Sequence, residues 1–251
     1  MHNKPLITII TITYNAELTI ENTILSIINQ TYSNIEYIII DGGSTDGTID
    51  IIKKYENKIS KWISEPDKGI YDAMNKGIKM ATGEWINFMN AGDTFYHTNT
   101  IDMVFSNNVS NYDVVYGGVN MKYENFDKTV WPKHKISRNH PMPFNHQSVF
   151  VRTTLYKMNL FDTTYRYAAD YNFFCKIYKI ARYKEIDQII ANYSVDGVSS
   201  TNGIAVNKER IKSNPCIYTY YLHALYYRNW FIKSILNKLG CKKFINTLRK
   251  I

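Results

Sequence analysis

The feature that most constrains the fold is the run LITIITIT at residues 6–13, which is apolar or β-branched at every position. Such runs are typical of strands covered on both faces, and parallel sheets with crossover helices are the usual source of that cover. Apolar residues at helical spacing follow over 17–30, and a second strand-like run, YIII, begins at residue 37. The chain is therefore expected to begin as a β-α-β unit.

The alternation continues to about residue 90. A helix is expected after residue 48 (IDIIKKYEN), a short strand at 61–64 (KWIS), a helix over 69–83 (GIYDAMNKGIKMATG) and a strand at 84–90 (EWINFMN). The apolar positions of the 69–83 segment fall on one helical face. Regular alternation of strands and helices predicts an α/β fold with a mostly parallel, Rossmann-like central sheet flanked by helices.

The pattern loosens after Asp93. Strands are expected at 113–119, at 146–152 and at 185–195, a helix over 167–181, and an ordered loop rich in proline and histidine at 131–146. From about residue 205 the sequence is helical and aromatic. We expect one main domain over residues 1–204 and a basic, aromatic, helical C-terminal extension over residues 205–251.

Charge is distributed unevenly along the chain. The formal net charge is +8, but the last acidic residue is Glu209, and nine lysines and arginines follow it. Residues 1–209 are thus close to neutral, which argues against a nucleic-acid groove there and for an anionic surface met by the tail. Three widely spaced cysteines predict free thiols in a reducing compartment. Neither a signal peptide nor a membrane-spanning helix is expected.

Polar groups follow the expected strands at three places. Thr13, Tyr14 and Asn15 come after the first strand, Asp41 after the second, and the turn Asn90-Ala91-Gly92-Asp93 after the fourth. In an open α/β sheet ligands bind beyond the carboxyl ends of the strands, so these groups are expected to meet at one edge. Turn chemistry alone also explains Asn, Gly and Asp, so each group by itself is a weak signal.

Two segments carry a resemblance to a known family. TITYNAELTIENTILSIINQTYSNIEYIIIDGGSTDGT and PDKGIYDAMNKGIKMATGEWINFMNAGD resemble family 2 glycosyltransferases of the GT-A fold, closely over about the first 100 residues and more loosely to about 200. The second is similar to a subset common in bacterial surface-polysaccharide clusters. The resemblance implies a nucleotide-sugar-binding half over 1–95 and an acceptor-binding half over 96–204. It also implies a glycan or lipid-linked oligosaccharide acceptor.

Several residues together suit the recognition of a nucleotide-sugar. Asp41 can accept a hydrogen bond from a uracil N–H, Tyr14 can stack on the base, and Thr13 can contact the base or ribose. Matching the family's motifs adds further donor contacts at Asn15, Asp67, Lys68, Asn75, Asn90, Ala91 and Gly92. The family often has an arginine where this chain has Met74, and Lys68 or Lys76 is the candidate replacement, with a solvated helix face as an equal alternative for each lysine. Asp46 fits the start of a helix better than a ligand site.

Asp93 is the expected metal ligand. Hard cations such as Mg²⁺ prefer carboxylate oxygens and take only one or two from protein when a diphosphate and water supply the rest. The family usually has an acidic pair, Asp-x-Asp, whereas this chain keeps only Asp93 and has Gly92 before it. Mn²⁺ or Mg²⁺ is the expected cofactor, with its affinity in question. Zinc is disfavoured by the histidine spacing.

Asp170 matches the family's acidic residue near the acceptor. An aspartate with an ordinary pKa of about 3.9 is ionised at neutral pH and can take a proton from an attacking hydroxyl. A helix-start aspartate is the structural alternative. His146 and Gln147 precede it in the family's order and are expected near the acceptor or the diphosphate, with a strand-edge hydrogen bond as the structural alternative for His146.

These features and the resemblance together predict a metal-dependent glycosyltransferase that uses a UDP-sugar. Inversion at the anomeric carbon and a place in bacterial surface-polysaccharide synthesis are what the resemblance alone implies. A degenerate nucleotide-sugar-binding or partner-binding subunit is the main alternative, supported by Gly92 and Met74. A nucleotidyltransferase is disfavoured because no glycine-rich phosphate loop follows the first strand. The basic, amphipathic tail predicts peripheral binding to the inner face of the cytoplasmic membrane, and packing on a second subunit is the alternative.

Overall fold

The fold is seen in a computed structural model, which describes residues 4–195 and 202–238. Its first half alternates four strands with three helices: β1 (Ile7–Thr13), α1 (Ile20–Ile28), β2 (Ile35–Asp41), α2 (Thr48–Lys54), β3 (Lys61–Ser64), α3 (Ile70–Met80) and β4 (Trp85–Phe88). β1 pairs in parallel with β2 and β4, and β2 pairs in parallel with β3. The parallel α/β half predicted from the sequence is confirmed.

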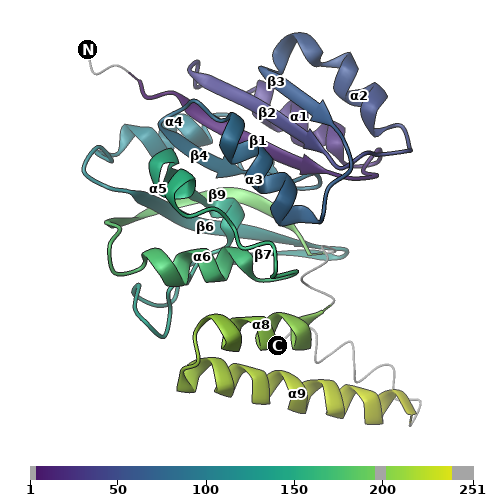
Figure 1. The fold of residues 1–251 in the computed structure, drawn as a ribbon, viewed down its shortest axis with the longest axis vertical. Coiled ribbons are helices and arrows are strands. Elements are labelled where there is room, and N and C mark those ends of the chain that lie inside the picture. The colour runs from purple at the N-terminus through teal and green to yellow at the C-terminus, as the bar shows by residue number, and fades with distance from the viewer. Residues whose placement is uncertain (1–3, 196–201, 239–251) are drawn as a thin grey trace.

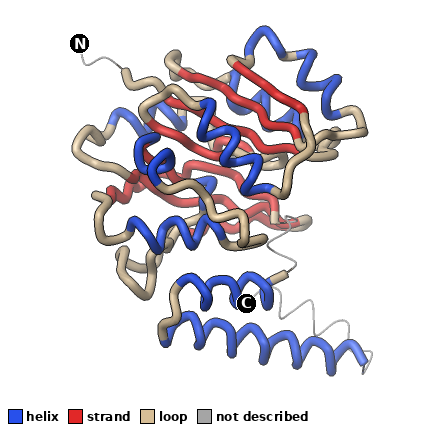
Figure 2. The backbone as a smooth tube through the Cα atoms, in the orientation of Figure 1, coloured by secondary structure: helices blue, strands red, loops and turns tan. Residues whose placement is uncertain are grey.

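The second half of the sheet has mixed strand directions. Its elements are β5 (Thr94–Phe95), α4 (Thr100–Ser106), β6 (Val114–Tyr123), β7 (Phe126–Val130), β8 (Val149–Arg152), α5 (Thr153–Met158), α6 (Ala169–Ile177) and β9 (Tyr183–Ser194). The strand order is β3-β2-β1-β4-β8-β6-β9-β5, with β7 paired to β6. β8 runs antiparallel to both β4 and β6, whereas β9 is parallel to β6. Figure 2 shows these strands as one layer flanked by helices.

Element boundaries differ from the expectation at several places. The strand expected from residue 146 begins at Val149, because residues 146–148 form the short 3₁₀ helix η2 (His146–Ser148), closed by a bond from the Ser148 N–H to the Asn145 carbonyl. A second such helix is η1 (Glu56–Lys58). The expected helices at 17–30 and 167–181 shorten to α1 and α6. Short elements span too few periods for a clear pattern, and β5, α4 and α5 escaped prediction for that reason.

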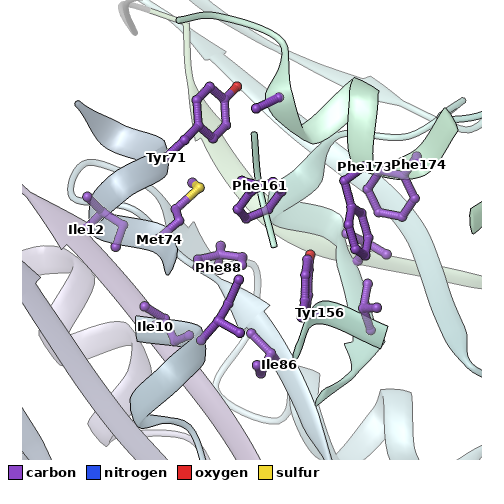
Figure 3. Close-up of a cluster of buried hydrophobic side chains, with 14 of the residues drawn as sticks. Ile10, Ile12, Tyr71, Met74, Ile86, Phe88, Tyr156, Phe161, Phe173 and Phe174 are labelled. Carbon is purple, nitrogen blue, oxygen red and sulfur yellow. The ribbon is translucent and has the colours of Figure 1, made fainter. Parts of the chain in front are cut away.

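Two apolar cores lie on the two faces of the sheet. Alternate residues of β1 divide between them: Ile10 and Ile12 join the helices α3, α5 and α6, whereas Ile7 and Ile9 join α1, α2 and α4. Figure 3 shows the first core, where the rings of Phe88, Tyr156 and Phe161 meet. Their centroids are 5.5 to 5.8 Å apart. This core ties α3 and α6, from distant parts of the sequence, to one face of the sheet.

Two helices follow the sheet. α8 (Gly203–Ser213) and α9 (Ile217–Lys238) pack on each other, and α8 also packs on α6 (Figure 1). The helical character expected after residue 205 is confirmed as far as Lys238. Among the described helices, none is both long and apolar enough to cross a bilayer. Residues 196–201 and 239–251, the latter part of the predicted basic tail, lie outside the described residues.

Candidate active site

The turn after β4 holds Asp93 in a buried position. The Asp93 N–H donates to the Asn90 carbonyl at 2.9 Å, and Gly92 between them has φ 98°, a value that favours glycine. The Ala91 N–H donates to the Ile12 carbonyl of β1, and the hydroxyl of Thr23 on α1 donates to the Asp93 carbonyl. β1, β4 and α1 therefore fix the backbone that carries this carboxylate.

The Asp93 carboxylate is nearly enclosed, with 5% of the residue exposed. Gln147 Nε2 donates to Oδ2 at 3.0 Å, and the Ser194 N–H at the end of β9 donates to Oδ1 at 3.1 Å. Burial raises the pKa of Asp93 to about 6, although the hydrogen bonds and the charge of His146 oppose the shift. These groups do not offset the cost of burying the negative charge of Asp93, and a bound cation would offset it.

The second carboxylate, Asp170, is the second residue of α6. Tyr71 on α3 donates its hydroxyl to Asp170 Oδ1 at 3.1 Å, and His146 Nδ1 lies 3.6 Å from Oδ2. On its other side, His146 Nε2 is 3.2 Å from the amide nitrogen of Asn90. A chain of polar contacts thus runs from the β4 turn through η2 to the start of α6.

The protonation of Asp170 depends on its neighbours. Burial by itself would raise its pKa, but the hydrogen bond and charge of His146, the N–H of Tyr171 and the charge of Arg210 together lower the pKa of Asp170 below its ordinary value. Burial and the charge of Asp170 in turn raise the pKa of Tyr71 well above the usual range. Tyr71 therefore remains a hydroxyl donor beside an ionised carboxylate over the physiological pH range.

Asp41 lies at the end of β2 and is fully buried. Its carboxylate accepts hydrogen bonds from the backbone of Gly43 and Ser44 and from the hydroxyls of Ser44 and Ser64, at 2.5 to 3.1 Å. In this state the carboxylate shapes the turn after β2. The contact of Asp41 with a base stays a prediction. It requires a ligand N–H to donate to a carboxylate oxygen that already accepts hydrogen bonds from the protein.

Other predicted donor contacts gather beside this turn. A Cβ built on Gly42 would lie 2.6 Å from Asp67 Oδ2 and 3.4 Å from the ring of Tyr14, so both side chains border Gly42. Tyr14 is 63% exposed, as a ring that stacks on a ligand must be. The hydroxyl of Thr13 is buried and, among the described residues, has no hydrogen-bond partner. A buried polar atom of this kind marks a place for a ligand or water.

Asn15 serves the same region by holding two strand ends together. Its N–H donates to the Ser44 hydroxyl, and its side-chain oxygen accepts from the Thr45 N–H. Asp46 accepts from the N–H groups of Glu17 and Thr48, as expected of a residue at a helix start. Its structural assignment is confirmed.

Three residues considered for the donor site, Asn75, Lys76 and Lys68, have different surroundings. Asn75 is buried, and its amide both donates to and accepts from the backbone of Phe161, so its contact with a donor stays a prediction. Lys76 pairs with Glu65 at 2.8 Å and donates to the Pro66 carbonyl, which anchors the loop that carries Asp67. Lys68 is exposed. The helical spacing of residues 69–83 does not distinguish an Asn75 amide that bonds to the protein backbone from one that contacts a ligand.

A divalent cation fits the chemistry of this edge. Over the described residues, no group of three or more His, Cys, Asp or Glu side chains gathers as a metal site, and the metal role of Asp93 stays a prediction. Asp93 offers a buried carboxylate, and Asn90 Oδ1 is buried without a described hydrogen-bond partner. Oxygen ligands of this kind suit Mg²⁺ or Mn²⁺ when phosphate oxygens complete the shell.

Three groups that act on the two carboxylates could not be predicted from the sequence. Tyr71 lies inside the quoted GIYDAMN segment, and only the packing of α3 against α6 shows that it meets Asp170. Ser194 contacts Asp93 through its backbone N–H, which no side-chain pattern can indicate. Arg210, whose charge acts on Asp170, belongs to a helix assigned to the extension.

Comparison with known sequences gives consistent similarities. The profile described as Glycosyl transferase family 2 matches residues 8–186. A PGL/p-HBAD biosynthesis glycosyltransferase of Mycobacterium bovis is 30% identical over 230 residues, which cover 84% of this chain and 84% of that protein. An uncharacterized glycosyltransferase of Haemophilus influenzae is 40% identical over 94 residues, 36% of this chain and 38% of that protein.

Solved structures share the fold. S. aureus TarS 1–349 in complex with UDP-GlcNAc superposes with a TM-score of 0.67 at 21% identity, over 83% of this chain and 66% of that one. The mannosyltransferase PcManGT from Pyrobaculum calidifontis, in complex with GDP-Man and Mn²⁺, gives 0.67 at 18% identity, over 88% and 71%. The chain spans 39% of a longer TarS chain. The likeness confirms a GT-A architecture.

Proposed function

The chain belongs to glycosyltransferase family 2, and we propose that it transfers a sugar from a UDP-sugar to a hydroxyl group of a glycan or lipid-linked acceptor, with inversion at the anomeric carbon. One observation carries the proposal. A buried carboxylate, Asp93, and a partly buried one, Asp170, are bridged by consecutive residues of η2, because Gln147 contacts the first and His146 the second. Sugar transfer requires a carboxylate at two places: one to hold the cation at the leaving diphosphate, and one to take the proton of the attacking hydroxyl.

Asp170 is proposed as the base. Its lowered pKa keeps it ionised at neutral pH, and Tyr71 and His146 hold its two oxygens. As an acceptor hydroxyl attacks the anomeric carbon, Asp170 takes its proton. Attack from the side opposite the diphosphate inverts the configuration, and the proton on Asp170 then passes to solvent.

Asp93 is proposed to hold Mn²⁺ or Mg²⁺, together with phosphate oxygens of the donor. The bound cation supplies electrostatic stabilisation of the charge that develops on the departing diphosphate. Gln147 and the Ser194 N–H orient the Asp93 carboxylate for this role. Gly92 leaves one acidic ligand where the family usually has a pair, so we expect weaker metal binding and the same chemistry.

The donor is proposed to bind at the ends of β1 and β2. Tyr14 would stack on the base, Thr13 would fill its unmet hydrogen bond on base or ribose, and Asp41 would accept from a uracil N–H. Asp67 and the Asn90–Gly92 turn would face the sugar and phosphates. The uracil preference rests on Asp41 and on the UDP-GlcNAc complex of TarS, whereas the GDP-Man complex of PcManGT makes guanine the competing base.

The pathway proposed is assembly of a bacterial surface polysaccharide at the inner face of the cytoplasmic membrane. The bacterial relative named for PGL/p-HBAD biosynthesis supports a biosynthetic role of this kind. α9 supports membrane contact, since its large side chains from Ile217 to Ile232 include many that are exposed and the chain carries no acid after Glu209. Packing of α9 on a second copy is the competing arrangement.

The proposal is tested by UDP release from a panel of UDP-sugars, with and without Mn²⁺ or Mg²⁺, using wild type and Asp93→Ala. Metal-dependent release from one sugar, lost in the variant, is the expected result. Release that is independent of metal and unchanged in Asp93→Ala would remove the metal role. If UDP and GDP-sugars bind but no acceptor extract supports turnover, the chain is a degenerate binding subunit.

A further inference from the structure

The last acidic residue of the chain contacts the segment that leads into Asp170. Glu209 lies on α8, and its carboxylate accepts three backbone hydrogen bonds at 2.9 Å, from the N–H of Arg166 to Oε1 and from those of Tyr167 and Ala168 to Oε2. One carboxylate from the C-terminal extension thus holds three successive amides of the acceptor half. These contacts show that the Glu209 carboxylate is bound to the protein and is not simply a solvated group on the surface of α8.

The helix that carries Asp170 needs such a partner. α6 begins after Ala168, and alanine has no side-chain oxygen to accept from the free N–H groups at a helix start. Glu209, from a different helix, accepts from the Ala168 N–H at the start of α6 and from the two amides before it, and its negative charge is favourable at the positive end of α6. Asp170 follows two residues after the last amide held by Glu209. We call these three hydrogen bonds to the Glu209 carboxylate the clamp, and the position of Asp170 depends on it.

Neighbouring residues fasten α8 against the same helix. Arg210 lies over the Tyr171 ring at 5.4 Å, and its charge contributes to the lowered pKa of Asp170. Ser213 and Asn214 approach Asn172 and Tyr171 at 3.4 Å. The amide of Asn214 also donates to the Arg138 carbonyl in the loop at 131–146. α8 is thus joined to both segments that border Asp170, rather than appended to the domain.

We propose that Glu209 is a positioning residue for the reaction, which holds Asp170 at the distance from His146 and Tyr71 that an ionised base requires. The proposal rests on the proposed function of Asp170. It assigns α8 to the active site and places the functional boundary of the catalytic unit beyond residue 204. The competing reading is that Glu209 only stabilises the fold.

The experiment uses the full chain with Glu209→Ala, the milder Glu209→Gln, and Lys208→Ala as the matched control at an exposed neighbour on α8. Glutamine keeps the length but only one acceptor oxygen. Turnover is measured with whichever UDP-sugar the wild type cleaves, and UDP binding is measured with Mn²⁺. We expect kcat to fall about 10- to 100-fold in Glu209→Ala, as for a misplaced catalytic group, while the affinity for UDP and Mn²⁺ stays within about twofold.

Two readouts separate positioning from stability. The acid limb of the pH–rate profile should move to higher pH in both Glu209 variants, because Asp170 loses part of its contact with His146. In an Asp170→Asn background, Glu209→Gln should cause no further loss of rate, whereas a purely structural role gives additive losses. Unchanged kcat, or additive losses, would overturn the proposal even if the melting temperature falls.

A third measurement does not depend on turnover. Backbone amide exchange over residues 165–171 should accelerate in both Glu209 variants and stay unchanged in Lys208→Ala. Unchanged exchange would refute the clamp itself. If the wild type shows the clamp but cleaves no nucleotide-sugar, the proposed function fails and the positioning role fails with it, while the structural contact stands. If Glu209→Ala does not fold, Glu209→Gln decides the outcome by the same criteria.

Discussion

Two consecutive residues, His146 and Gln147, direct their side chains to two different carboxylates. His146 Nδ1 lies 3.6 Å from Asp170 Oδ2, and Gln147 Nε2 donates to Asp93 Oδ2 at 3.0 Å. Both belong to η2, whose tight turn sends neighbouring side chains in different directions. A shift of this short helix would therefore disturb the proposed base and the proposed metal ligand together.

The two residues of η2 should give different phenotypes when changed. In His146→Ala, Asp170 loses the contact and charge that lower its pKa, so the acid limb of kcat/KM should move to higher pH. In Gln147→Ala, Asp93 loses the hydrogen bond that opposes its raised pKa, so more Mn²⁺ should be needed at neutral pH. Rate–pH profiles and Mn²⁺ titrations of both variants test this. Matching phenotypes in the two variants would contradict separate roles.

Metal use should depend on pH near the pKa of Asp93, which burial raises to about 6. Mn²⁺ binding requires the ionised carboxylate, so the apparent Mn²⁺ affinity in the presence of UDP should be roughly fourfold lower at pH 5.5 than at pH 7.5. The stability of the metal-free protein should change with pH in the opposite direction. The folded state holds this proton more tightly than the unfolded state, so Asp93's contribution to stability falls as pH rises from about 4 to about 6.

Calorimetric titration of Mn²⁺ at the two pH values checks the first effect, and Asp93→Asn provides the control. The asparagine variant should bind Mn²⁺ weakly at both pH values, with no difference between them. An equal pH dependence in wild type and variant would show that another group controls metal binding.

Glu36 provides a contrast, as a buried carboxylate remote from the proposed chemistry. Burial would raise its pKa, but bonds from Thr82, Thr8 and Lys61 prevail and lower the pKa of Glu36 to about 2. Because the folded pKa is depressed, its stabilising effect is present above about pH 4.5 and is lost as pH falls towards about 2. Glu36→Ala should lower the free energy of unfolding by about 2–3 kcal/mol near pH 7, since it leaves buried donors unpaired.

Urea unfolding at pH 7 and pH 3 measures this contribution. Glu124→Ala, at an exposed position, is the matched control and should change the unfolding free energy by no more than about 0.5 kcal/mol. The kcat of Glu36→Ala should match the wild type at a temperature where both are folded. A large loss of kcat in folded protein would assign Glu36 a part in the site that its contacts do not indicate.

Membrane contact by α9 should depend on its exposed aromatic side chains. Tyr227, Trp230 and Phe231 are each about half exposed. Replacing all three with serine should weaken sedimentation with vesicles that contain phosphatidylglycerol by about tenfold or more, because their apolar surface no longer enters the interface. Phe126→Ser, at an exposed aromatic on β7, is the control.

Binding to phosphatidylcholine vesicles should be weaker than to vesicles with phosphatidylglycerol, and truncation of residues 229–251, which removes most of the tail's cations, should reduce this difference. Unchanged vesicle binding in the triple variant and the truncation would refute membrane contact. A shift from dimer to monomer in the triple variant would indicate instead that α9 packs on a second subunit.

The sequence by itself determined the parallel half of the fold. The run at 6–13 and the alternation up to β4 could hardly satisfy another architecture, because strands buried on both faces need helices on both sides. The same logic placed Asp41 and Asp93 at one sheet edge, since carboxyl ends of neighbouring parallel strands meet there. Local pattern and backbone hydrogen bonding are enough for both inferences.

Only the tertiary structure decided which side chains face one another. Asn75 and Tyr71 share one helix, yet Asn75 binds the Phe161 backbone and Tyr71 reaches Asp170. The Ser194 N–H and the Glu209 carboxylate reach their partners across long stretches of chain. Periodicity records which face of an element is apolar, but contacts between distant elements depend on how those faces pack, and that information is absent from any single segment.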